Sequence, residues 1–223
     1  MKKEIELKYL LSKKEDLLRL KAALGPYMKE SSKLLVQENY YFDTPQLALK
    51  KDGISLRLRK ENQDFWLSAK QSLGKKKQKN NLSIRLEFEG IIDFEAGELI
   101  KDQFLSPLEA FRLMPAEGEG EATKKLLLGH MKKALKEGLQ MVGSFINHRV
   151  AVPIEILGHK IILELDHSFY PQNIEIFEVE IEFSSAQEAE LLRPLIEELF
   201  DQVPIKTHKS ISKSSRLYKI LFS

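Results

Sequence analysis

Five stretches of this sequence alternate charged and apolar residues with a period of two, and this pattern limits the possible folds more than any other feature. In residues 4–9 every even position is charged and every odd position is apolar or aromatic. Successive side chains of a β-strand point to opposite faces, so each stretch predicts a strand with one charged and one apolar face. The other four stretches are residues 56–59, 84–89, 161–166 and 177–183.

Like charges share these faces. Glu178, Glu180 and Glu182 follow one another on one strand face, and Arg57 and Arg59 share a face of another strand. A single Glu-x-Glu pattern is also typical of a solvent-exposed face. Adjacent like charges repel, however, and several such faces require compensating charges. The pattern therefore favours a barrel with charged faces inward and apolar faces covered by helices, forming a tunnel for a multiply charged ligand.

The remaining periodicities predict an α+β protein built on an antiparallel sheet. Apolar residues at helical spacing predict helices, and runs rich in β-branched and aromatic residues predict strands. The predicted helices are 13–24, 107–113, 121–137 and 186–200, with Ser12 and either Ser184 or Ser185 as caps. The predicted strands are 5–9, 36–42, 54–59, 65–70, 82–88, 145–152, 159–166, 176–183 and 215–221. The segment 115–120 is either a hinge or a loop.

Composition excludes several kinds of chemistry. The 223 residues contain no cysteine, so any catalytic or metal-binding group uses oxygen or nitrogen. There are 35 Lys and Arg residues against 33 Asp and Glu, a net charge of +2, which argues against an extended nucleic-acid-binding surface. No stretch approaches the roughly 18 apolar residues of a membrane span, and early charges interrupt any signal peptide, so we expect a cytoplasmic protein that does not enter a membrane.

Motifs along the whole chain resemble those of the CYTH domain, or triphosphate tunnel metalloenzyme, family. The resemblance begins at the N-terminal E-x-E-x-K motif, residues 4–8, and ends at the lysine-serine-arginine element, residues 213–216. Between them lie Tyr41-Phe42-Asp43-Thr44, Leu56-Arg57-Leu58-Arg59, a strand ending in Lys70, Arg85-x-Glu87, Arg149, the acids Glu164 and Asp166, and Glu178-Val179-Glu180.

The resemblance implies one tunnel domain over residues 1–223, with a helical segment at about 106–138 inside it. It implies an eight-stranded antiparallel barrel that binds a small triphosphate with Mg²⁺ or Mn²⁺. Known members include inorganic, thiamine and RNA triphosphatases and a class of adenylate cyclase, so the fold defines the ligand better than the reaction. We expect a metal-dependent hydrolase and favour tripolyphosphate over thiamine triphosphate; a class IV-type adenylate cyclase and a non-catalytic polyphosphate or nucleotide sensor remain alternatives.

The resemblance also assigns site residues. Arginine forks and lysine ammonium groups suit phosphate, and carboxylates suit hard divalent ions. The predicted triphosphate-binding bases are Lys8, Arg57, Arg59, Lys70, Arg85, Arg149 and Lys213. The predicted metal ligands are Glu4, Glu6, Asp166, Glu178 and Glu180. Glu4, Glu6 and Lys8 are the predicted catalytic residues, Lys8 as a possible base if Arg57 and Arg59 crowd it and lower its pKa.

For several other residues the sequence leaves two roles open. Glu87, Glu89, Glu164 and Glu182 either pair with the bases or face the tunnel mouth, and Trp66 either stacks on a substrate ring or packs in the fold. The basic loop 75–79 is either solvated or guides polyanions, and His208 lies near the C-terminal basic element. Ser55 stands where animal thiamine triphosphatases tend to have an aromatic residue. The predicted assembly is a monomer or a homodimer.

Overall fold

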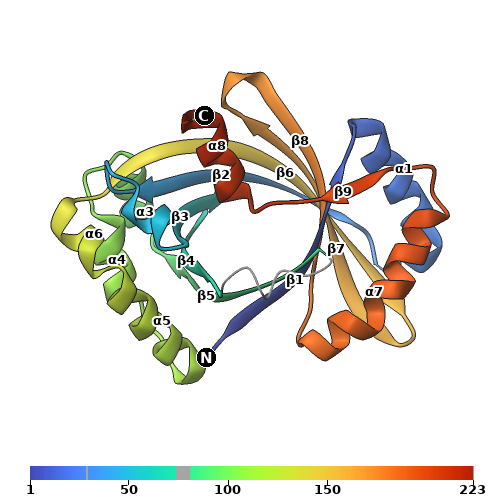
Figure 1. The fold of residues 1–223 in the computed structure, drawn as a ribbon, viewed down its shortest axis with the longest axis horizontal. Helices are drawn as coiled ribbons and strands as arrows, with labels where there is room; N and C mark the ends of the chain where they lie inside the picture. Colours follow the sequence, from blue (N-terminus) through green and yellow to red (C-terminus); the bar gives the residue numbers. More distant parts are fainter. Residues whose placement is uncertain (29, 74–80, 223) are drawn as a thin grey trace.

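Eight antiparallel strands close into a barrel in the computed structural model, which describes residues 1–28, 30–73 and 81–222 (Figure 1). The strand order is β5-β4-β3-β2-β6-β7-β8-β1, and pairing of β1 with β5 closes the ring. A short ninth strand also pairs with β1. The strands are β1 (Lys3–Leu11), β2 (Lys33–Asp43), β3 (Ile54–Glu61), β4 (Asp64–Ser72), β5 (Leu82–Ile92), β6 (Gln140–Ile156), β7 (His159–Tyr170), β8 (Ile174–Glu182) and β9 (Thr207–Lys209).

Helices cover the barrel in separate groups, with α1 and α7 on one side and α3 to α6 on the other (Figure 1). The helices are α1 (Lys14–Leu24), α2 (Ala48–Lys51), α3 (Phe94–Lys101), α4 (Pro107–Leu113), α5 (Gly118–His130), α6 (Lys132–Glu137), α7 (Ala186–Asp201) and α8 (Lys213–Phe222), with short 3₁₀ turns η1 (Gly25–Tyr27) and η3 (Pro171–Asn173). The predicted α+β barrel with helical cover is therefore confirmed.

The apolar core lies between the barrel wall and these helices, because the outward strand faces are apolar. One cluster joins β1, β6, β7 and β8 to α1 and α7, and includes Leu7, Leu163 and Leu192. A second joins β2 to β5 to α3, α4 and α5, and includes Leu58 and Phe111. All five of these side chains are fully buried. Two layers of hydrocarbon thus hold the barrel from outside and leave its interior to polar side chains.

The predicted C-terminal strand at 215–221 is wrong, because this segment forms α8. Leu217 and Leu221 lie four residues apart, which places them on one helical face. Leu217 is fully buried in a cluster with Tyr41 and Phe145, and a side chain at Gly143 would meet Leu217 and Leu221. A run of seven residues does not distinguish the two periods reliably, and packing against β6 selects the helix.

The other predicted segments differ from the structure in smaller ways. Ser185 caps α7 by accepting a hydrogen bond from the Glu188 amide, but α1 begins after Lys13, without a side-chain cap. The predicted helix at 121–137 is divided at Met131 into α5 and α6. Part of the 115–120 segment is the first turn of α5, which packs on β4 and β5. The short helices α2 and α3 and the strand β9 were not predicted.

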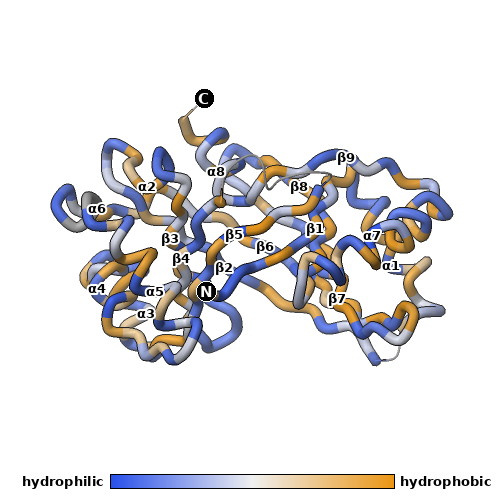
Figure 2. The backbone as a smooth tube through the Cα atoms, turned by 60° about the horizontal axis from the view of Figure 1, so that its bottom comes forward, coloured by the Kyte–Doolittle hydropathy of each residue, from blue (hydrophilic) through white to orange (hydrophobic). Residues whose placement is uncertain are grey.

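Hydrophobic and hydrophilic stretches alternate along the helices (Figure 2). Within the described part of the chain, no helix combines the length and the apolar character needed to cross a membrane.

Gly97 allows α3 to pack directly on β4, and its replacement tests this contact. A Cβ atom at position 97 would overlap the ring and Cβ of Phe65, which is fully buried. We expect Gly97→Ala to lower the free energy of unfolding by about 1–3 kcal/mol through overpacking. Gly129→Ala in α5 is the matched control, because a Cβ there meets no atom of the described residues within 4 Å.

Urea denaturation measures both changes. Gly129→Ala should leave stability unchanged or raise it by up to about 1 kcal/mol, since alanine is the better helix former. Equal effects of the two substitutions would contradict the close approach of α3 to β4.

Candidate active site

A polar cavity of about 240 Å³ occupies the barrel interior, and we call it the central cavity. All seven bases predicted from the sequence line it: Lys8, Arg57, Arg59, Lys70, Arg85, Arg149 and Lys213. Seven acids line it as well: Glu4, Glu6, Glu87, Glu89, Glu164, Glu180 and Glu182. The inward faces of the strands therefore bring the two sets of charges together, as the alternating pattern predicts.

The pairing register of the strands opposes acids to bases. Glu4 lies opposite Arg85, and Lys8 lies opposite Glu180. Two further cross-strand pairs of this kind are Lys70 with Glu87 and Arg149 with Asp166. Opposite charges on directly facing strand residues attract, so this register stabilises the closed barrel with its charges inside.

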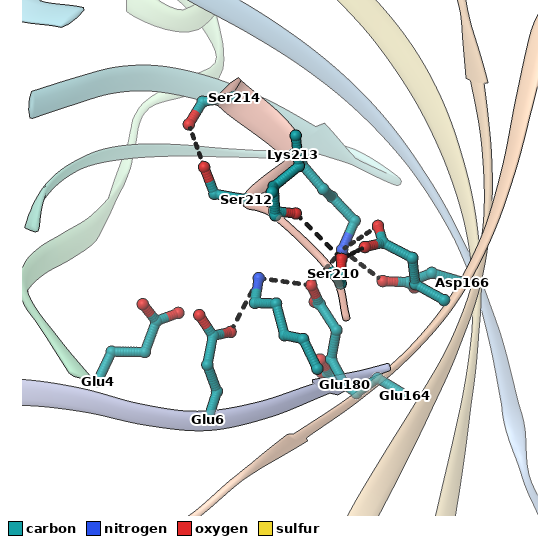
Figure 3. Close-up of polar contacts among 12 residues, drawn as sticks. Glu4, Glu6, Glu164, Asp166, Glu180, Ser210, Ser212, Lys213 and Ser214 are labelled. Carbon is teal, nitrogen blue, oxygen red and sulfur yellow. Dashed lines mark hydrogen bonds and ion pairs between the residues drawn. The ribbon is translucent and has the colours of Figure 1, made fainter. Parts of the chain in front are cut away.

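Three residues of β1 point into the cavity and are nearly buried, with exposed fractions of 6% for Glu4, 5% for Glu6 and 7% for Lys8. Glu4 forms ion pairs with Lys70 at 2.5 Å and with Arg85 at 2.9 Å. Arg85 also pairs with Glu6. Glu4 and Glu6 stand side by side on β1 (Figure 3). Arg85 thus pairs with both of these adjacent carboxylates.

A second network surrounds Arg149. Its guanidinium donates two hydrogen bonds to Asp166, at 2.8 and 2.7 Å, and one to Glu180 at 2.8 Å. The Lys213 ammonium lies 2.8 Å from Asp166 and 2.6 Å from Glu180, between the two acids (Figure 3). Glu164 approaches Arg149 at 2.5 Å. Burial, together with repulsion from Asp166 and Glu180, outweighs the attraction of Arg149 and raises the pKa of Glu164 to about 7.

The arginines of β3 share a single acid. Arg57 and Arg59 each contact Glu89, at 3.0 and 3.1 Å. Arg57 also donates to the Ser68 hydroxyl at 3.3 Å. Burial and the neighbouring Arg57 lower the pKa of Arg59. Two guanidinium groups with one carboxylate leave this side of the cavity locally positive, which favours an anion.

Three buried side-chain atoms form no hydrogen bond to the described residues. They are Glu4 Oε2, Arg59 Nε and Arg85 Nε. An unsatisfied buried polar atom is costly and usually binds a water, an ion or a ligand. Glu4 Oε2 lies 2.9 Å from Arg85 in an ion pair, so the donors Arg59 Nε and Arg85 Nε are the two atoms that a bound anion or a water would satisfy.

The expected lowering of the Lys8 pKa is wrong. The Lys8 ammonium lies 2.6 Å from Glu180 and 3.1 Å from Glu6, whereas the expectation placed Arg57 and Arg59 beside it. Burial alone would lower its pKa, but Glu180 and then Glu6 outweigh burial and raise the pKa above its ordinary value. Lys8 is therefore protonated in this arrangement.

Two predicted metal ligands lie behind the cavity wall. Asp166 and Glu178 are fully buried and do not line the central cavity, unlike Glu4, Glu6 and Glu180. Both carboxylate oxygens of Glu178 accept from Arg216, at 2.8 and 2.9 Å, and one also accepts from Ser210. Arg216 was not among the predicted site residues. The arginine of the C-terminal element was the available signal, but its partner was not evident from the sequence.

The residues present fit a divalent ion of the magnesium type. Among the described residues, no group of three or more metal-binding side chains converges as a preformed site. Mg²⁺ usually keeps several waters and uses one or two carboxylates together with substrate phosphates. Glu4 and Glu6 supply such a pair, and Glu182 lies opposite Glu6 in the β1–β8 register without an ion pair to any described residue.

Asp43 has a structural role within the Tyr41–Thr44 motif. Its Oδ1 accepts from the amides of Thr44 and Leu49, both at 2.8 Å. Its Oδ2 accepts from the Lys50 amide at 3.0 Å and from the Tyr218 hydroxyl at 2.8 Å. Asp43 therefore connects the end of β2 to α2 and to α8, the helix that carries Lys213.

The remaining candidates lie away from the central cavity. Trp66 does not line it and instead contacts Arg59, whose guanidinium carbon lies 5.5 Å from the ring centre. His208 is exposed and contacts Ser12 at 3.3 Å. The basic loop at 75–79 lies outside the described residues.

The pair of Glu178 and Arg216 should be important for stability. We expect Glu178→Gln to lower the free energy of unfolding by about 3–5 kcal/mol, because it leaves the buried Arg216 without its counter-charge. The double variant Glu178→Leu/Arg216→Met should recover much of this loss, since it removes both charges. Chemical denaturation of the three proteins measures the effect.

Glu190→Gln is the control for this prediction, because Glu190 pairs with Arg193 on the surface at 3.3 Å. Exposed ion pairs contribute about 0–1 kcal/mol, so this variant should unfold like the original protein. If Glu178→Gln behaves in the same way, the buried pair does not stabilise α8.

Comparisons with known proteins agree with this geometry. The chain is 27% identical over 216 residues to the presumed triphosphatase YjbK of Bacillus subtilis (strain 168), covering 97% of this chain and 94% of that protein. A Hippeastrum protein, HpAC1, described as a presumed adenylyl cyclase with a dominant triphosphatase activity, has a similar fold with a TM-score of 0.71 at 23% identity, covering 99% of this chain and 97% of that one.

A presumed adenylate cyclase of Bacillus halodurans also shares the fold, with a TM-score of 0.61 at 24% identity and complete coverage of both chains. The model of the CYTH domain family matches residues 2–218. The charged barrel, its inward motif residues and this match agree, and the chain belongs to the CYTH domain family.

Proposed function

We propose that this protein is a divalent-metal-dependent triphosphatase that hydrolyses the terminal phosphate of a small triphosphate bound in the central cavity. The observation that carries this proposal is the convergence of seven bases on a buried cavity in which Glu4 and Glu6 lie side by side. The names of YjbK and HpAC1, which both refer to triphosphatase activity, support the same reaction.

Ligand binding would replace one set of ion pairs with another. The cavity acids now neutralise the cavity bases, and the pairs are short, such as Lys8 to Glu180 at 2.6 Å. A triphosphate offers the bases a denser set of anionic oxygens, and a divalent cation offers the acids a denser positive charge. The two ligands should therefore bind together, because either one alone leaves a set of buried charges without partners.

The roles of the residues follow from their positions. Glu4 and Glu6 would hold Mg²⁺ or Mn²⁺, and Glu180 lies on the same cavity wall. Once bound, the metal would reduce charge on the phosphate oxygens and help to generate the attacking water. Arg57 and Arg59 would bind phosphate oxygens through their paired N–H groups. Lys8, held protonated, would stabilise the negative charge that develops during in-line displacement.

Inorganic tripolyphosphate is the favoured substrate. Tyr41 is the one aromatic residue among the described residues that line the central cavity, and it is 4% exposed and stacked on Phe145. Ser55 lines the cavity without a ring, and Trp66 does not line it. A thiamine ring or a nucleobase would thus lack a stacking partner, which also disfavours the adenylate cyclase alternative.

A phosphate-release assay tests the proposal. With Mg²⁺ or Mn²⁺, the protein should release phosphate from tripolyphosphate faster than from thiamine triphosphate, ATP or pyrophosphate, and EDTA should abolish release. Glu4→Gln/Glu6→Gln should lower kcat/KM by about a hundredfold or more, because the cavity loses both metal-binding carboxylates.

Glu95→Gln/Glu109→Gln is the matched control, since both residues are exposed acids in the first turns of α3 and α4. It should retain full activity. Cyclic AMP and pyrophosphate formed from ATP would instead identify a cyclase. Binding of tripolyphosphate without turnover, seen as a rise in Tm, would identify a sensor.

Substitution of Lys8 tests its charge role. Lys8→Arg should keep activity within about tenfold and leave the pH dependence near neutrality unchanged, because it retains a positive charge. Lys8→Met should lose about a hundredfold or more. If Lys8→Arg instead abolishes a titration that the original protein shows near neutral pH, Lys8 acts as a base after all.

A further inference from the structure

A second cavity, of about 480 Å³, adjoins the central cavity, and we call it the vestibule. Lys8, Ser55, Lys70, Arg85, Ser212 and Ser214 line both cavities, so the two are continuous. The vestibule is twice as large as the central cavity. Its wall comes from one end of β3, β4 and β5 together with α2, α8 and the segment that follows β9.

The vestibule differs from the central cavity in its charge. Its described lining contains six bases and no carboxylate, whereas the central cavity has equal numbers of acids and bases. Lys8, Lys70 and Arg85 are shared with the central cavity, and Lys50, Lys209 and Lys219 belong to the vestibule alone. These last three are exposed and form no ion pair with any described carboxylate. Their field favours an anion at this end of the tunnel.

The described lining of the vestibule has hydroxyl groups but no accessible ring. Ser72, Ser210 and Ser215 join the shared serines in its wall. Tyr218 is the one aromatic residue among its described lining residues, and it is 2% exposed. The Lys50 ammonium lies 4.8 Å from the centre of the Tyr218 ring, and the Tyr218 hydroxyl donates to Asp43. A planar substituent would therefore find no free face on which to stack.

We infer that the vestibule binds the further phosphates of a linear inorganic polyphosphate whose terminal phosphates occupy the central cavity. This inference rests on the proposed triphosphatase function and extends it to chains longer than three phosphates. Water would attack the terminal phosphorus, the terminal phosphoanhydride bond would break, and orthophosphate would leave a chain shortened by one unit. A cationic substituent such as thiamine would be repelled by the same lysines.

The test compares chain lengths in a vestibule variant. The probes are tripolyphosphate, tetraphosphate, long-chain polyphosphate and thiamine triphosphate, each with Mg²⁺ or Mn²⁺. Lys50→Gln/Lys209→Gln/Lys219→Gln should lower kcat/KM for long-chain polyphosphate by about tenfold and change that for tripolyphosphate by less than about twofold. It should improve the use of thiamine triphosphate relative to tripolyphosphate, because repulsion of its positive ring decreases.

Lys14→Gln/Lys21→Gln/Lys160→Gln is the matched control, because it removes three exposed charges that line neither cavity. It should leave the ratio of long-chain to tripolyphosphate kcat/KM unchanged. The inference is overturned if the vestibule variant loses activity equally on all four probes, or if the control variant shifts the ratio as much.

A binding measurement separates this inference from the proposed function. With Mg²⁺ or Mn²⁺ present, long-chain polyphosphate should raise the Tm of the original protein more than tripolyphosphate does, and the vestibule variant should lose that additional rise. This result supports the vestibule even if no phosphate is released, in which case the triphosphatase proposal alone fails. Equal rises with both anions in both proteins would refute the inference.

Discussion

Burial of opposite charges inside the barrel is the constraint on which the rest of this structure depends. Ionised side chains in a low-dielectric interior are costly unless each has a partner, so closure of the ring requires acids to meet bases. The β1–β5 and β6–β7 registers achieve this by opposing Glu4 to Arg85 and Arg149 to Asp166. With its interior occupied by charge, the barrel cannot hold an apolar core there. The hydrocarbon is therefore on the outside, and α1, α7 and α3 to α5 are needed to cover it.

Strand pairing does not place a base opposite every acid, and α8 supplies the missing basic side chains. In the β7–β8 register Asp166 lies opposite Glu178, and Glu164 lies opposite Glu180, so acid faces acid. Lys213 and Arg216 from α8 neutralise this wall, at 2.8 Å to Asp166 and 2.8 Å to Glu178. Where the β1–β8 register opposes Glu6 to Glu182, Lys8 and Arg85 pair with Glu6, and Glu182 has no ion pair to any described residue. Glu182 therefore has a carboxylate free for the cation that we propose.

The sequence predicts the barrel well because the alternation of side chains along a strand is a local rule. In residues 4–9 and 177–183 the charged side chains occupy alternate positions, and this alone identifies the inward face of each strand without knowledge of any contact. The partner of an inward side chain depends on register, which is not local, and this explains the error over Lys8. Its neighbours are Glu6 and Glu180 rather than Arg57 and Arg59. The helix at 213–222 was missed for a related reason, because its short apolar run fits both periods until it packs on β6.

The same network is compatible with the proposed binding of a cation and an anion in one site, where the described residues hold no preformed metal cluster. Among the described residues, the buried acids and bases of the cavity pair with one another, and the donors Arg59 Nε and Arg85 Nε lack an acceptor. Buried ion pairs add little net stability compared with apolar packing, so the size of this network supports the proposed role in ligand binding. Before ligand binding, the acids neutralise the neighbouring bases and reduce their mutual repulsion. The bases neutralise the acids in the same way. We therefore expect this site to have little affinity for a lone phosphate or a lone cation, because either would leave buried charges of the other sign uncompensated.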